Sequence, residues 1–161
     1  DTLIEIENLL SIFFIFYLFN LFGKCFLGDN GIYVTSIFIS IYVITFININ
    51  SEVSPILALN LLWYPAFENL FTITRRLIFK DNIQVADRLH LHVLIFEKIL
   101  NKKRVTFSNS ISGIILNIYM YIGLFFSMKY FNDNKLLLTI LLINILLYII
   151  FFIFFFLKKS K

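Results

Sequence analysis

Residues 75–104 read RRLIFKDNIQVADRLHLHVLIFEKILNKKR, and this basic stretch separates the apolar segments on either side of it. It contains eight of the fourteen Lys and Arg residues, and its centre, Asp87-Arg88-Leu89-His90-Leu91-His92, holds both histidines of the chain. The flanking segments are long and apolar enough to enter a bilayer. The stretch is therefore expected to face water at a membrane boundary, where paired imidazoles suit the handling of an anion.

The composition excludes an ordinary soluble domain. Hydrophobic residues make up 60% of the 161 positions and charged residues only 15%, which is typical of an integral membrane protein. The net charge of +4 arises from Lys and Arg at the borders of apolar runs, so it indicates membrane topology rather than nucleic-acid binding. The single cysteine, Cys25, excludes a disulfide within the chain.

Five uncharged or weakly charged runs approach the roughly 20 residues that a helix needs to cross a bilayer. They are about 8–22, 32–49, 55–74, 105–128 and 136–157. Helices are expected because a spanning segment in lipid must satisfy its own backbone hydrogen bonds, and no run alternates like a barrel strand. The sequence thus predicts an all-α, polytopic transmembrane bundle of about five helices, forming one membrane domain over residues 1–161.

The distribution of Lys and Arg predicts the orientation. If the chain alternates through five helices, one side receives Lys24, the eight basic residues of 75–104 and three in the tail, and the other receives only Lys129 and Lys135. By the positive-inside rule the first side is cytoplasmic. The turn at Asp29 and the loop 75–104 then lie on the same face of the membrane, where they can share one site.

The first cytoplasmic turn carries a candidate acidic ligand. Gly28 and Gly31 flank Asp29 and permit a tight turn with positive φ where a helix begins. A capped loop is the simpler interpretation of this turn, but a carboxylate at the membrane boundary is costly unless it is paired or binds a cation. Phe26, three residues earlier, is by itself more typical of packing in the membrane.

The histidine pair is the strongest local signal. His90 and His92 would point to opposite sides of a helix, so we expect an extended backbone if both imidazoles are to reach one ligand. Their neighbours Asp87 and Arg88 support an anion site, although a plain solvated loop remains an alternative. A zinc site is a weaker alternative. The two histidines and Asp87 could supply three ligands, but no Cys pair lies nearby and the histidines are not spaced as His-x-x-x-His on a helix.

Glu68 is the one acidic residue in the interior of a predicted span. Pro65, three residues before it, removes a backbone donor and is expected to bend the helix. Glu68 also shares a helical face with Arg75 and Arg76. We therefore interpret it as an internal structural ion pair that positions the basic stretch, in preference to a catalytic group.

Several motifs, in this order, resemble the C-terminal half of the polyprenyl-phosphate sugar-1-phosphate transferases, which are multi-helix bacterial membrane enzymes. The motifs are Gly23-Lys-x-Phe-Leu-Gly-Asp29-x-Gly31, Glu52-Val-Ser-Pro55, Tyr64-Pro-x-x-Glu68, Arg75-Arg76 and Asp87-Arg-Leu-His-Leu-His92. The resemblance covers about residues 18–100, and beyond it the last two helices match in hydropathy alone.

The resemblance implies a role for each matching residue. Asp29 corresponds to a catalytically essential aspartate that binds Mg²⁺, or Mn²⁺ in its place, and Phe26 to an aromatic ring stacked on uracil. His90 and His92 correspond to the histidine motif at the diphosphate, and substrate-binding roles fall to a further set of charged residues: Lys24, Asp87 and Arg88. A single His92, where some members carry three consecutive histidines, favours the hexosamine-phosphate branch.

The implied reaction transfers a sugar-1-phosphate, typically N-acetylhexosamine-1-phosphate, from a UDP-sugar to undecaprenyl phosphate, with release of UMP. It places the protein in the bacterial inner membrane with a cytoplasmic active site, and it allows a homodimer. The paired aspartates and the nucleotide-contacting segment of the family have no counterpart in residues 1–161, so we expect these residues alone to be inactive. The alternative is a non-catalytic helical subunit or a transporter half.

Overall fold

The computed structural model describes residues 2–79, 89–100 and 104–159. It is 86% helical, and the described residues contain no strand, which confirms the predicted all-α class. Six helices follow one another along the chain: α1 (Thr2–Leu21), α2 (Gly28–Ile49), α3 (Ile56–Phe79), α4 (Leu91–Ile99), α5 (Val105–Lys129) and α6 (Asn134–Lys159).

Four of these helices, α2, α3, α5 and α6, are long and apolar enough to cross a membrane. The first predicted span is α1, whose apolar part, Glu7–Leu21, is shorter than the other four. The stretch 75–104 is not a simple loop, because α3 continues to Phe79 and α4 occupies 91–99. Within α3 the helix passes through Pro65 without interruption.

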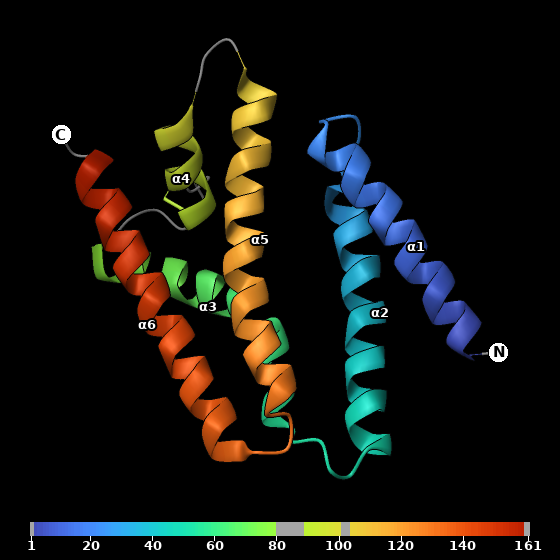
Figure 1. The fold of residues 1–161 in the computed structure, drawn as a ribbon. Coiled ribbons are helices and arrows are strands. Elements are labelled where there is room, and N and C mark those ends of the chain that lie inside the picture. Colours follow the sequence, from blue (N-terminus) through green and yellow to red (C-terminus); the bar gives the residue numbers. More distant parts are fainter. Residues whose placement is uncertain (1, 80–88, 101–103, 160–161) are drawn as a thin grey trace.

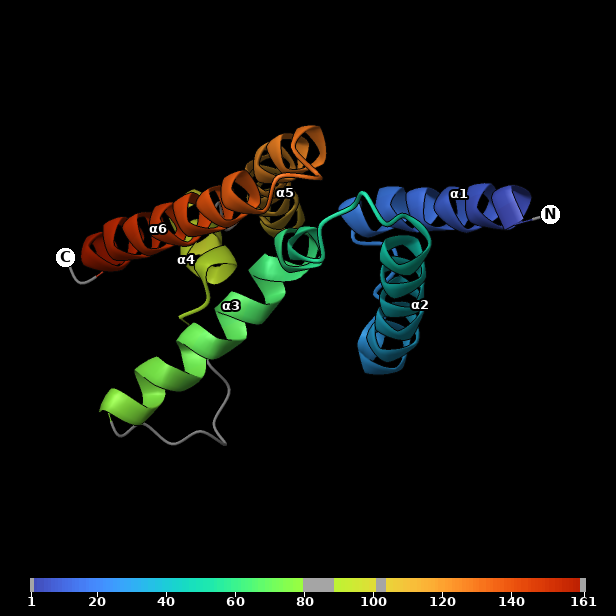
Figure 2. The same cartoon turned by 90° about the horizontal axis from the view of Figure 1, so that it is seen from below.

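The helices form two groups that meet along α5. In Figure 1, α5 and α6 make a hairpin joined at the lower end, with α4 beside both near the upper end and α3 running obliquely to them. The hairpin of α1 and α2 lies on the other side of α5 and turns at the upper end, and Figure 2 shows the same separation of α2 from α4. The α1–α2 turn, the last turn of α4 and the C-terminal end of α6 therefore lie towards one end of the molecule (Figure 1).

The core is formed by α3, α4, α5 and α6. Its largest cluster of buried residues combines aromatic and aliphatic side chains: Trp63, Leu91, Leu94, Ile95, Leu116, Tyr148 and Phe152. The short helix α4 contributes three of them and is thus an integral part of the packing. In contrast, α2 has no buried residue, so its apolar side chains face outward as those of a membrane span do.

Helices α5 and α6 approach closely at Gly123. A Cβ atom added there would lie 2.5 Å from Asn144 Nδ2 and 3.0 Å from Asn144 Cγ, so the Asn144 side chain would have to shift to admit a larger residue. Asn144 is buried, and its backbone carbonyl accepts a hydrogen bond from the Tyr119 hydroxyl at 2.6 Å. The small size of Gly123 thus leaves space for the buried Asn144 amide between the two helices.

We expect Gly123→Ala to destabilise the protein by about 1–3 kcal/mol, because the methyl group overfills the contact with Asn144. The measurement is the unfolding midpoint of the purified protein in detergent micelles. Gly113→Ala on the same helix is the matched control, since nothing lies within 4 Å of its added Cβ. That control is expected to be neutral or to stabilise by up to about 1 kcal/mol. Equal midpoints for the two variants would contradict the close packing.

Candidate functional site

His90 and His92 lie face to face at the start of α4. Their ring centroids are 5.5 Å apart and their planes differ by 15°. His90 is the N-cap residue, with extended backbone angles of φ −71° and ψ 146°, whereas His92 is already inside the helix. The expectation of an extended segment through both histidines was therefore wrong. A single extended residue followed by the first helical turn is enough to bring the two imidazoles together.

Glu68 of α3 holds the start of α4. Its side chain is buried, and Oε1 accepts a hydrogen bond of 2.9 Å from the backbone N–H of Leu91. The same oxygen lies 3.4 Å from Nδ1 of His90. The His90 side chain does not cap the helix itself. Glu68 thus serves as the capping group for α4 from a different helix, which supports its predicted role in positioning the basic stretch.

Two tyrosines share the environment of Glu68. The hydroxyl groups of Tyr64 and Tyr148 are buried and have no hydrogen-bond partner within normal distance among the described residues. Both nevertheless lie close enough to Glu68 to interact with it electrostatically, and Tyr148 interacts in the same way with Arg75. The carboxylate, the histidines and the two phenols form a polar cluster, called here the Glu68 cluster, that joins α3, α4 and α6.

The environment of His92 favours its neutral form. Partial burial lowers the pKa of the imidazole below its usual value, and the neighbouring His90 acts in the same direction. The negative charge of Glu68 opposes this effect and raises the pKa. Since burial is the largest of the three contributions, His92 is expected to be neutral at pH 7.

The α1–α2 turn presents the other predicted site residues. Lys24, Phe26 and Asp29 are all exposed, and Phe26 keeps 80% of its surface accessible. Asp29 lies in the first turn of α2, where a carboxylate interacts favourably with the positive end of the helix. Gly28 has the predicted positive φ, +65°, but the second glycine with this conformation is Gly23 rather than Gly31, which lies within α2.

Helix α5 carries both parts of the candidate site. On one side, the Ser110 hydroxyl donates to the backbone carbonyl of Leu21, and Gly23 packs against Thr106. On the other side, the Ser108 hydroxyl donates to the carbonyl of Ile99 at the end of α4, at 3.3 Å. The turn before Asp29 and the helix that bears the histidines are thus attached to the same two turns of α5.

The structure brings together only some of the predicted residues. His90 and His92 are in contact, but Asp29 is exposed on a helix that both Figure 1 and Figure 2 show apart from α4. Asp87 and Arg88 lie outside the described residues. Within the described ranges, no group of three His, Cys, Asp or Glu side chains is placed to hold a metal ion.

No family model, curated protein or solved structure matches this chain.

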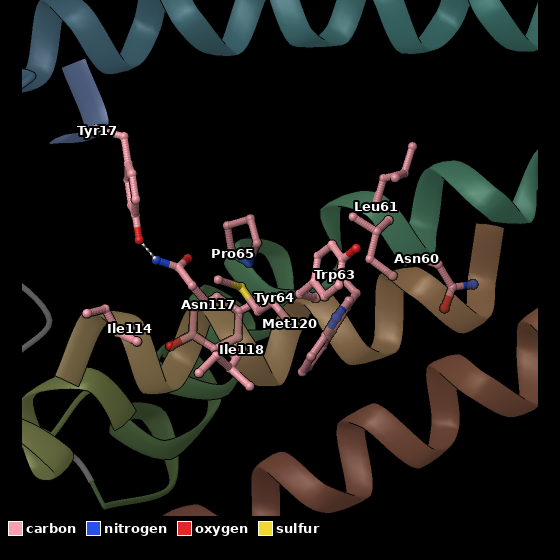
Figure 3. Close-up of a pocket in the computed structure, with 12 residues that line it drawn as sticks. Tyr17, Asn60, Leu61, Trp63, Tyr64, Pro65, Ile114, Asn117, Ile118 and Met120 are labelled. Atoms are coloured by element: carbon pink, nitrogen blue, oxygen red, sulfur yellow. Dashed lines mark hydrogen bonds between the residues drawn. The ribbon is translucent and has the colours of Figure 1, made fainter. Parts of the chain in front are cut away.

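A cleft of about 520 Å³ opens between α1, α3 and α5 within the apolar part of the molecule. Figure 3 shows Tyr17 of α1 reaching towards Asn117 of α5, whose Nδ2 donates to the Tyr17 hydroxyl at 3.5 Å. Tyr64 lines the cleft as well, so the cleft borders the Glu68 cluster. Most of its remaining wall is apolar, which suits an alkyl or prenyl chain better than a charged solute.

The sequence did not indicate that Tyr64, Tyr148 and the backbone of Leu91 belong to this site. Tyr64 belongs to the Tyr64-Pro-x-x-Glu68 motif, which assigns no role to the tyrosine itself. Tyr148 stands in a run of apolar residues with no local signal of a polar role. A tyrosine in the middle of a span, one turn before a buried acid, is a signal that could have identified Tyr64.

We expect His92 to titrate with a midpoint below 6.5, because burial disfavours its charged form. The fold then binds fewer protons than the unfolded chain, so it loses stability as the pH falls below the unfolded pKa of about 6.5. Histidine NMR signals followed against pH measure the midpoint. Glu68→Gln should lower it further, since the carboxylate charge raises the pKa of His92. A midpoint at or above 6.5 in the wild type would refute the assigned environment.

Proposed function

We propose that this chain is part of a bacterial polyprenyl-phosphate sugar-1-phosphate transferase. The observation that carries the proposal is the stacked pair of His90 and His92, which Glu68 holds at the start of α4. Two imidazoles held by a buried acid are an arrangement suited to a phosphate-bearing substrate. The order of the sequence motifs supports the same family.

Asp29 is the residue that would hold the divalent cation. Its carboxylate is exposed and can contribute one ligand, and Mg²⁺ commonly takes its remaining ligands from substrate phosphates and water. A single carboxylate therefore fits as part of such a site. When bound, the cation neutralises negative charge on the diphosphate.

The residues of this chain would position the reactants rather than form a covalent intermediate. An oxygen of the lipid phosphate attacks the β-phosphorus of the UDP-sugar and forms a new P–O bond, while the bond to the α-phosphate breaks and UMP leaves with the electron pair. His90 and His92 orient the substrates through hydrogen bonds, and Lys24 contributes positive charge. Phosphoryl transfer depends mainly on such positioning and charge neutralisation.

The location of the cleft in Figure 3 supports a lipid acceptor. It opens at the level of the spans, is mostly apolar and borders the Glu68 cluster through Tyr64. A phosphate at the cytoplasmic boundary with its hydrocarbon chain in the bilayer would place its polar and apolar parts against surfaces of matching character. The cytoplasmic side is the end that carries the α1–α2 turn and α4, by the positive-inside rule.

We expect Asp29→Asn and His90→Ala each to lower UMP release by about 10²-fold or more, because the first removes the carboxylate that would hold the cation and the second removes the imidazole that orients a substrate. The assay follows transfer from UDP-N-acetylhexosamine to undecaprenyl phosphate in membranes containing the complete gene product, including any residues that precede Asp1. Lys135→Gln, at an exposed position near the start of α6 that lies outside every matched motif, is the control and should retain full turnover. Wild-type turnover in both test variants would rule out the assigned roles.

A further inference from the structure

The contact between Glu68 and His90 distinguishes the two nitrogens of the imidazole. Nδ1 lies 3.4 Å from Oε1 of Glu68, whereas no polar atom of the described residues is recorded against Nε2. The side chain of Glu68 is only 8% exposed and that of His90 is 26% exposed. One edge of the ring is therefore committed to the interior of the protein, and part of the ring remains accessible from outside.

The position of Oε1 is fixed independently of His90. The backbone N–H of Leu91 donates to the same oxygen at 2.9 Å, so the carboxylate group cannot turn away from the histidine without leaving a buried N–H without a partner. The ring of His90 is in turn held by its stacking on His92. Both sides of the contact are thus restrained by interactions that do not depend on the protonation of His90.

A neutral imidazole has one N–H donor and one nitrogen with a lone pair, and an ionised carboxylate can only accept. If the lone pair of Nδ1 faced Oε1, two acceptors would oppose each other in a buried site, which is unfavourable. The proton therefore belongs on Nδ1, and Nε2 carries the lone pair. A carboxylate behind a histidine commonly selects the tautomer and orients the ring in this way.

We propose that Glu68 is a positioning residue that holds His90 in the Nδ1–H tautomer and thereby leaves Nε2 as a hydrogen-bond acceptor. The substrate chemistry that fits Nε2 is an O–H donor. This second statement rests on the proposed function, in which the donor is either a protonated oxygen of the acceptor phosphate or a hydroxyl of the sugar. The first statement concerns the fold alone and can be tested without any substrate.

The direct test is ¹⁵N NMR of the histidine rings, using the full 161-residue chain in lipid nanodiscs at pH 7.5. The signals absent from the His90→Gln spectrum belong to His90, because the chain has only two histidines. We expect the wild type to show a protonated Nδ1 and a lone-pair Nε2 at His90. A wild-type spectrum dominated by the Nε2–H tautomer would overturn the proposal, whatever the activity of the protein.

Two variants separate tautomer selection from general support of the fold. Glu68→Gln keeps an oxygen that can accept from both Leu91 and His90, so it should retain the Nδ1–H pattern. Glu68→Leu removes the acceptor and should shift His90 towards the Nε2–H tautomer. Glu52→Leu, an exposed acid at the other end of the molecule, should change neither pattern. An unchanged His90 tautomer in folded Glu68→Leu would also overturn the proposal.

Kinetics of the complete gene product identify the donor. Glu68→Leu should lower kcat with unchanged KM for the UDP-sugar if the donor is the acceptor phosphate, and should raise that KM if the donor is the sugar. Glu68→Gln should restore most of the lost rate. Identical kinetics for wild type and Glu68→Leu would exclude an O–H donor at Nε2. Absence of transfer by the wild type would contradict the proposed function and leave the NMR result standing.

Discussion

The buried carboxylate of Glu68 is the constraint on which the position of α4 and its two histidines depends. Burying an acid in an apolar domain costs several kcal/mol unless hydrogen bonds compensate it. Here the compensation comes from the N–H of Leu91, with His90 at the other side of the same oxygen. The requirement to satisfy one acid on α3 therefore determines where α4 begins and which way the first histidine faces.

The histidine pair is a product of tertiary structure rather than of local propensity. A helix of nine residues is not stable alone in water, so α4 must obtain its stability from its surroundings. This stability comes from the packing of three α4 residues into the cluster around Trp63, namely Leu91, Leu94 and Ile95. Glu68 adds the hydrogen bond that caps the helix. Loss of this support would separate the imidazoles without any change to the histidines themselves.

The fold class and the long spans could be predicted because bilayer thickness sets the length of an apolar helix, a property visible in each run separately. The stacking of His90 on His92 could not be predicted in this way. It depends on the capping of α4 by Glu68, which lies 23 residues before Leu91 in the sequence. Local rules also selected Gly31 for the turn, although it is Gly23 that meets Thr106 of α5 and adopts positive φ. The predicted meeting of Asp29 with the histidines depends on tertiary contacts in the same way, and the described residues do not form it.

Ser108 and Ser110 give α5 a mechanical role. They stand two positions apart, and one donates to the end of α4 while the other donates to the end of α1. Because both hydrogen bonds lie within one turn of α5, any tilt of this helix would displace the ends of α4 and α1 together. The separation between the α1–α2 turn and the end of α4 is thus set through contacts with one helix.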